Sequence, residues 1–100
     1  MGDTNYLAST VKILEKPTQS VDSNKIVSTE FRAQLVQVRN SQIVNLVFWG
    51  NLARDVASYY QVNDYIMIEG YVSLRNKTNT ESIKQNLKTI QITVLKIYSI

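Results

Sequence analysis

The strongest constraint on the fold of this 100-residue chain is an alternation of apolar and polar residues that recurs in five separate segments. Alternation with a period of two is typical of a β-strand that has one face on a core and the other on solvent. One stretch has a different period, because Leu52, Val56 and Tyr60 recur every four residues, as on one stripe of a short helix. The five predicted strands span residues 7–15, 26–38, 43–49, 65–75 and 87–98.

The order of these elements is three strands, one short helix and two further strands. This order predicts an all-β chain that forms a five-stranded oligonucleotide-binding (OB-fold) barrel, with the helix between the third and fourth strands. A five-stranded barrel of another topology and a half-sandwich that needs a partner are the alternative architectures. A chain of this length has enough residues for one core and too few for two, so we expect residues 1–100 to form a single OB-fold domain.

The few helix- and strand-breaking residues fall at the predicted ends of these elements. The chain has one proline, which closes the first strand ahead of a polar turn over residues 16–25. Gly50 breaks the third strand, and Asn51 is then the predicted N-cap of the helix. Gly70 lies inside the fourth strand, where a glycine predicts a bulge or a sharp bend.

The alternation also assigns a direction to each strand residue. On the third strand, Trp49 lies on the opposite side from Phe48, so it is predicted to point away from the core. Tyr60 is in phase with the apolar stripe of the helix and is predicted to pack in the core. The residues predicted to point inward from the strands are Leu7, Val11, Ile13, Val27, Phe31, Ala33, Leu35, Val44, Leu46, Phe48, Ile66, Ile68, Val72, Leu74, Ile90, Ile92 and Val94.

The composition excludes several classes of function. The chain has no Cys and no His, which removes thiol nucleophiles, disulfides, the commonest metal ligand and the commonest general base. Its acidic residues show no spacing typical of a metal site, and no phosphate-binding glycine loop is present. We therefore expect a protein that is not an enzyme, with no cofactor and no metal. The longest apolar runs have only four residues, against about 18 to 20 for a membrane-spanning helix, so we expect no membrane insertion.

The charge and the N-terminal residues bear on partner and location. Eleven Lys and Arg against eight Asp and Glu give a formal net charge of +3, which is compatible with an anionic polymer as partner. Residues 1–5 contain no basic region leading into an apolar run, so no secretory signal is expected. We therefore expect the protein to work in the compartment where it is made.

Three segments of the chain resemble the bacterial single-stranded DNA-binding (SSB) protein family. The segments are Phe48–Ala53, Tyr59–Tyr60 and Ile68–Val72. They are similar to an aromatic-Gly-x-Leu-Ala element, a helix ending in Tyr and a strand reading apolar-Glu-Gly. The likeness is strongest over residues 44–75 and looser over residues 7–98. The run from Trp49 to Ala53 is most similar to the short, tail-less SSB-like proteins of cyanobacteria and algal plastids.

The resemblance implies a barrel that stacks bases on outward aromatic side chains while basic side chains hold phosphates. The partner is then single-stranded nucleic acid, with DNA favoured and RNA as the alternative, and a homo-oligomer is expected. The implied location is a plastid stroma (chloroplast) or a bacterial cytoplasm. Trp49 matches a family stacking position, and Tyr71 is a candidate substitute for another. The predicted nucleic-acid-binding residues are Trp49, Tyr71, Arg32, Arg39, Arg75, Lys77, Lys84 and Lys88.

The chain departs from the family at three other stacking positions. Two of them hold Ile43 and Lys77 here, and the third has no counterpart because the turn over residues 39–42 is short. A base stacked on an aromatic ring contributes roughly 1–3 kcal/mol, so these departures predict weaker binding than is typical of the family. Glu30 and Glu69, on the outward set, also reduce the attraction for phosphates.

A protein-interaction or structural role is the alternative function. Ile43, Val47 and Trp49 alternate along one strand, so the sequence predicts that they form a contiguous outward apolar patch. Such a patch suits a protein partner. On this hypothesis nucleic-acid binding has been lost and the barrel docks on a larger protein complex, in a plastid or elsewhere.

Overall fold

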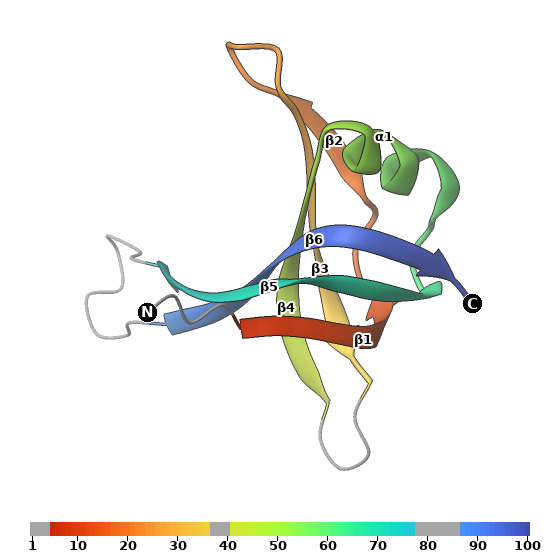
Figure 1. Ribbon diagram of the computed structural model, residues 1–100, viewed down its shortest axis with the longest axis vertical. Coiled ribbons are helices and arrows are strands. Elements are labelled where there is room, and N and C mark those ends of the chain that lie inside the picture. Colours follow the sequence, from red (N-terminus) through yellow and green to blue (C-terminus); the bar gives the residue numbers. More distant parts are fainter. Residues whose placement is uncertain (1–4, 37–40, 78–86) are drawn as a thin grey trace.

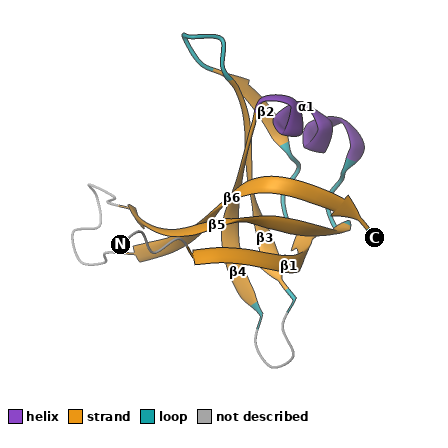
Figure 2. Cartoon of the chain, viewed as in Figure 1, coloured by secondary structure: helices purple, strands orange, loops and turns teal. Residues whose placement is uncertain are grey.

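The structure is a computed structural model that describes residues 5–36, 41–77 and 87–100. Strands make up most of these residues. A single helix interrupts them (Figure 1; Figure 2). In chain order the elements of this part of the protein are β1 (Asn5–Ile13), β2 (Thr18–Val21), β3 (Val27–Leu35), β4 (Gln42–Trp49), α1 (Gly50–Tyr59), β5 (Tyr65–Lys77) and β6 (Leu87–Ser99).

The strands form one sheet in the order β1-β5-β6-β4-β3-β2, and β1 also pairs with β3. That second pairing, from Val11↔Leu35 to Ile13↔Ala33, closes β1, β3, β4, β5 and β6 into a five-stranded barrel. Only β4 and β6 are parallel among the described pairs, and α1 connects β4 to β5. The predicted fold class, a five-stranded OB-fold barrel with one short helix, is confirmed.

The strand β2 was not predicted, because residues 16–25 were expected to form only a polar turn. Its four residues are all exposed and pair only with β3, from Thr18↔Glu30 to Val21↔Val27. A strand with no buried face has no apolar alternation, so its pattern is not visible in the sequence. The β2–β3 hairpin extends away from the barrel, at the top of Figure 1.

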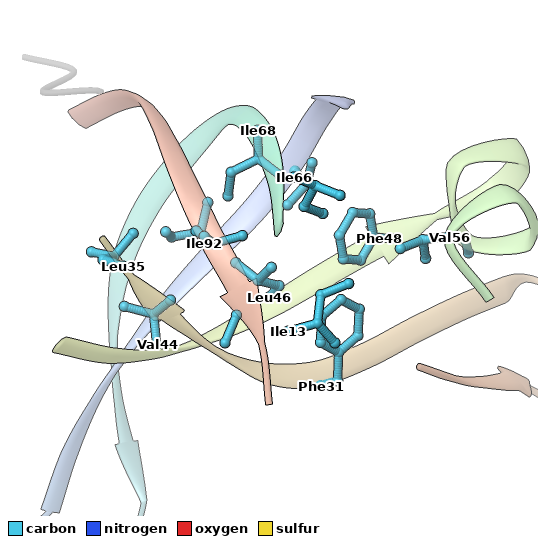
Figure 3. Packing of buried hydrophobic residues seen from close by; sticks show 14 of the residues in the cluster. Ile13, Phe31, Leu35, Val44, Leu46, Phe48, Val56, Ile66, Ile68 and Ile92 are labelled. Carbon is cyan, nitrogen blue, oxygen red and sulfur yellow. The ribbon is translucent and has the colours of Figure 1, made fainter. Parts of the chain in front are cut away.

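The barrel core contains the residues that the alternation predicts, with one exception. Figure 3 shows Phe31, Phe48 and Leu46 packed with isoleucines from β1, β5 and β6. The rings of Phe31 and Phe48 stack with their centroids 5.4 Å apart. Leu74 was predicted to point into the core but is 67% exposed. The pairing of β1 with β5 ends at Asn5↔Val72, so Leu74 lies beyond it, where β6 is the only described strand that pairs with β5.

The helix starts two residues earlier than predicted. Its N-cap is Trp49, in an extended conformation and with no side-chain cap, so the prediction of Asn51 as N-cap is wrong. Gly50 has a φ of +61°, a value that glycine adopts without strain, and this conformation turns the chain directly from β4 into α1. The buried hydroxyl of Thr29 donates a hydrogen bond of 2.8 Å to the carbonyl of Ala53, which joins α1 to β3.

Two smaller predictions are confirmed. The register of β5 against β6 shifts between Glu69 and Gly70, so a bulge lies where the glycine predicts one. Tyr60, at the C-terminal end of α1, packs against the core, and its hydroxyl lies 2.8 Å from that of Ser99.

Candidate nucleic-acid interface

Trp49 lies at the end of β4, on the outer face of the barrel. Its neighbour Phe48 is fully buried, whereas Trp49 is 50% exposed, as the alternation predicts. Its partner across the sheet is Ser28 on β3. The open half of the indole ring gives this position a flat apolar surface that a nucleic-acid base can stack on.

Arg32, a predicted phosphate contact, lies on the same outer face but already has a carboxylate partner. Its Nη2 is 2.9 Å from Oε2 of Glu15, and its Nε donates to the same oxygen at 3.0 Å. The backbone N–H of Arg32 donates to Oε1 of Glu15 at 2.7 Å, so this carboxylate also fills a gap in the hydrogen bonding of β3. The positive charge of Arg32 is therefore largely balanced before any phosphate arrives.

A second carboxylate lies further along this face. Glu30 is opposite Val47 in the register, and it accepts a hydrogen bond from the side-chain amide of Asn45. Together with Glu15 it places two carboxylates on the outer side of β3, near Arg32. This part of the barrel therefore attracts phosphates less than its predicted basic residue suggests.

The predicted apolar patch of Ile43, Val47 and Trp49 is not contiguous. Ile43 is 57% exposed, but Val47 is only 6% exposed, so the prediction of an exposed Val47 is wrong. Val47 is flanked by β3 on one side and by β6 on the other, within the short β4–β6 pairing that runs from Asn45 to Val47. Ile43 and Trp49 lie beyond that pairing.

Tyr71 lies on the outer side of β5, within a group of aromatic residues that we name the tyrosine surface. Tyr6 on β1 is directly opposite Tyr71, and their rings meet edge to face with centroids 5.5 Å apart. The hydroxyl of Tyr6 donates to Oε2 of Glu69 at 2.7 Å, and that of Tyr98 donates to Oε1. The tyrosine surface comprises Tyr6, Tyr65, Met67, Glu69, Tyr71 and Tyr98, and all of its apolar members are substantially exposed.

The hydrogen bonds of this surface shift the pKa values of its titratable groups. The bond to Glu69 raises the pKa of Tyr6 to about 12, and it raises the pKa of Tyr98 as well. The hydrogen bonds from Tyr98 and Tyr6 lower the pKa of Glu69, since they favour its charged form. The carboxylate therefore remains ionised at neutral pH and is held by two phenols.

The sequence did not identify Tyr6 and Tyr98 as members of a site. Each lies on an outward position of its strand, so periodicity gives its face but not its neighbours. The register of β1, β5 and β6 brings them to one carboxylate from positions 63 and 29 residues away along the chain. A pairing of strands this distant in sequence leaves no local signal.

The remaining predicted basic residues fall at the far ends of β5 and β6 or outside the described residues. The register places Arg75 opposite Thr89 and pairs Asn76 with Lys88. Lys77 ends β5 next to them, so the backbone brings Arg75, Lys77 and Lys88 into one two-stranded ribbon. The predicted contacts Arg39 and Lys84 lie outside the described residues.

Within residues 5–36, 41–77 and 87–100, no group of acidic residues is placed to hold a metal ion. In the same part of the chain, no helix has the length and apolar character needed to cross a membrane.

Two known proteins resemble the chain in sequence. "Putative single-stranded DNA-binding protein ycf41" of Trieres chinensis is 42% identical over 98 residues, which cover 94% of this chain and 87% of that protein. The protein of the same name from Pyropia yezoensis is 26% identical over 88 residues, or 88% of this chain and 79% of that protein. No protein-family model matches the chain.

Solved structures share the fold. A small single-stranded DNA-binding protein from Streptomyces coelicolor has a TM-score of 0.83 at 14% identity, and covers 99% of this chain and 96% of its own. The SSB domain of a protein from Synechococcus sp. has a TM-score of 0.74 at 18% identity, with 98% of both chains covered. These structures support the barrel, and the 42% identity to the Trieres chinensis relative decides the family: the chain belongs to the ycf41 family of SSB-like proteins.

Proposed function

We propose that this protein binds single-stranded DNA without strong sequence preference, and that its function is binding rather than catalysis. The observation that carries the proposal is the half-exposed ring of Trp49 on the outer face of the barrel. The names of the ycf41 relatives support single-stranded DNA as the ligand. Stacking on an aromatic ring tolerates every base, because every base has a π-face, so little sequence preference is expected.

The basic residues that we propose to hold phosphates lie chiefly outside the barrel part of β3. Arg32 is paired with Glu15, so we assign it a smaller part than the sequence implied. Arg75, Lys77 and Lys88 occupy one ribbon, and with Arg39 and Lys84 they form the proposed basic set. Tyr71, the other stacking residue implied by the sequence, we assign instead to the oligomer interface proposed below, because its ring packs against that of Tyr6 within the tyrosine surface. RNA remains the alternative polymer, since neither stacking nor phosphate contacts distinguish the two.

The alternative of a docking module that has lost nucleic-acid binding is not favoured. Its predicted patch is interrupted by the buried Val47, and the chain belongs to a family whose named members are single-stranded DNA-binding proteins. Docking on a larger complex could accompany DNA binding, but no described surface specifies such a partner.

The first prediction uses Trp49, the only tryptophan of the chain, as its own probe. We expect oligo-dT to quench its fluorescence at low salt, because a stacked base contacts the ring directly. Titrations at two salt concentrations should show that the affinity falls as salt rises, with a slope of about −0.7 in log K against log [salt] for each phosphate held. An unchanged fluorescence at low salt, with oligo-dT and with oligo-rU, would contradict the proposal.

We further propose that the protein forms a homo-oligomer through the tyrosine surface. Monomeric proteins rarely expose a contiguous apolar patch larger than a few hundred Å². Here Tyr6, Tyr71 and Tyr98 lie on three adjacent strands, and their neighbour Met67 is also exposed. The one carboxylate among them, Glu69, is already satisfied by two hydroxyls, so covering it with a second copy would leave no unpaired acceptor.

The second prediction tests this surface with a charge. We expect Met67→Lys to shift the protein from an oligomer to a monomer in sedimentation velocity, because it places an ammonium group in the middle of the apolar interface. Ile43→Lys is the matched control, since Ile43 is also an exposed apolar residue but lies on β4. A wild-type protein that sediments as a monomer at tens of micromolar, a typical concentration for such runs, would exclude the interface.

We propose the plastid stroma as the location, with a bacterial cytoplasm as the alternative. The likeness to the ycf41 relatives supports the plastid. Detection of the protein in isolated plastids of its source organism would test this assignment.

A further inference from the structure

A row of small polar side chains continues the outer face from Trp49 onto the β2–β3 hairpin. Ser28 is the cross-strand partner of Trp49, and Ser20 on β2 is the partner of Ser28. Directly opposed residues of an antiparallel pair share a face, with their Cβ atoms roughly 5 Å apart. The cross-strand row that starts at the indole ring therefore continues with two hydroxyl groups.

The hairpin ends in an exposed cation. Lys25 lies three residues before Ser28, or about 10 Å along an extended strand, and its φ of 63° belongs to the tight turn at the tip. The nearby carboxylate of Asp22 accepts hydrogen bonds from the backbone N–H groups of Asn24 and Ile26, at 2.8 and 2.9 Å. Within the described part of the chain no ion pair involves Lys25. Its charge is thus available to an anion.

The opposite direction along β3 is acidic. Glu30 is the next residue after Ser28 on the same face, and Glu15 lies beyond it against Arg32. A phosphate that moved from Trp49 toward the barrel would approach the carboxylate of Glu30 and then the ion pair of Glu15 with Arg32. One that moved toward the hairpin tip would meet two hydroxyls and then the ammonium group of Lys25, beside Asp22, whose carboxylate accepts two backbone hydrogen bonds. The charges on β3 therefore favour one direction over the other.

We infer that a single-stranded polynucleotide leaves Trp49 along the β2–β3 hairpin, with Ser28 and Ser20 contacting its sugar–phosphate backbone and Lys25 pairing with a phosphate. This inference rests on the proposed function and adds a contact surface that the sequence reasoning did not contain. The hairpin then contributes affinity and direction without reading bases, because hydroxyl and ammonium groups here face the backbone of the ligand.

The first experiment compares Lys25→Asp with Lys16→Asp, using oligo-dT binding at low and high salt. Aspartate tolerates the positive φ of residue 25 better than most residues do. Lys16 is also exposed, but it lies with Ser58 and Gln61 at the C-terminal end of α1, whereas Trp49 precedes the N-terminal end. Both variants have the same net charge, so any difference between them is local.

We expect Lys25→Asp to weaken binding about tenfold at low salt, and to reduce the salt slope by about 0.7, the value of one lost phosphate contact on a single strand. Lys16→Asp should change the affinity by no more than about twofold, as expected of a surface charge remote from the ligand. An unchanged thermal midpoint will show that both variants are folded.

The second experiment compares Ser28→Thr with Ser28→Val. The two new side chains have the same shape and both suit a strand, but only threonine retains the hydroxyl. We expect the threonine variant to bind oligo-dT like the wild type and the valine variant to bind severalfold more weakly.

The outcomes separate this inference from the proposed function. If the wild type binds oligo-dT while Lys25→Asp and Lys16→Asp bind equally, the hairpin path is wrong and the function stands. If the two Ser28 variants bind oligo-dT equally, the proposed contact of the Ser28 hydroxyl with the ligand is wrong and the function stands. If the wild type shows no binding at low salt, both the function and the path are wrong.

Discussion

Gly70→Ala should be the most destabilising single-methyl change in this protein, with a loss of about 3 kcal/mol or more in the free energy of unfolding. A Cβ atom at this position would lie 2.2 Å from the carbonyl oxygen of Thr93 and 2.9 Å from its carbon. Both atoms belong to the backbone of β6, so no side-chain rotation can relieve the overlap. The bulge between Glu69 and Gly70 would have to rearrange. The pairing of β5 with β6, which runs from Ile66↔Ser99 to Lys77↔Leu87, would have to rearrange with it.

Gly50→Ala is the matched control for this prediction. It adds the same methyl group, and nothing lies within 4 Å of the added atom, but the φ of +61° strains an alanine. That strain costs roughly 1–2 kcal/mol. Urea denaturation of the two variants should therefore show a much larger loss for Gly70→Ala. Equal losses would mean that the approach of β6 to Gly70 is not a tight constraint.

Trp49→Ala should lower the affinity for oligo-dT by a factor of roughly 5 to 150, the effect of losing one base stack of about 1–3 kcal/mol. The expected effect is large because the chain departs from its family at three other stacking positions, so this ring carries much of the contact. The variant has no tryptophan, and binding must be followed by the anisotropy of a labelled oligonucleotide. The fold should be unaffected, since the ring is half exposed and outside the core.

Two further substitutions make this measurement specific to stacking. Ile43→Ala removes another exposed apolar side chain from β4, and we expect it to change the affinity by less than about twofold, because an aliphatic side chain offers no π-face. Tyr71→Ala should give a smaller loss than Trp49→Ala, since we assign the ring of Tyr71 to the tyrosine surface, where it contacts Tyr6, rather than to base stacking. Wild-type affinity in Trp49→Ala would remove the main support for the proposed function.

The outward direction of Trp49 was predictable because it depends only on the alternation within one strand. Phe48 faces the core, so the next residue must face away, whatever the neighbouring strands do. The same local reasoning predicted the five barrel strands, nearly all of their buried residues and the bulge at Gly70. Asn51 failed as a predicted N-cap because the conformation of Gly50 allows the helix to begin directly after the strand.

The surroundings of Trp49 were not predictable in this way. Val47 is outward by alternation and yet buried, and it lies in the pairing of β4 with β6, a strand from a distant part of the chain. Arg32 is a basic residue, but its charge is largely balanced, because the segment that follows β1 brings the carboxylate of Glu15 against its guanidinium group. Predicting either of these facts requires the register between strands, and the apolar–polar periodicity within one strand does not specify that register.

The sequence by itself therefore determined the five barrel strands, the order that builds the barrel, and the side of each of these strands that a residue occupies. Those properties follow from local alternation and from where glycine and proline interrupt it. Only the tertiary structure decided which outward residues become neighbours: the tyrosines held by Glu69, the serines beside Trp49 and the carboxylates on β3. The physical reason is that burial, charge balance and hydrogen bonding act between strands, over separations along the chain at which sequence patterns carry no information.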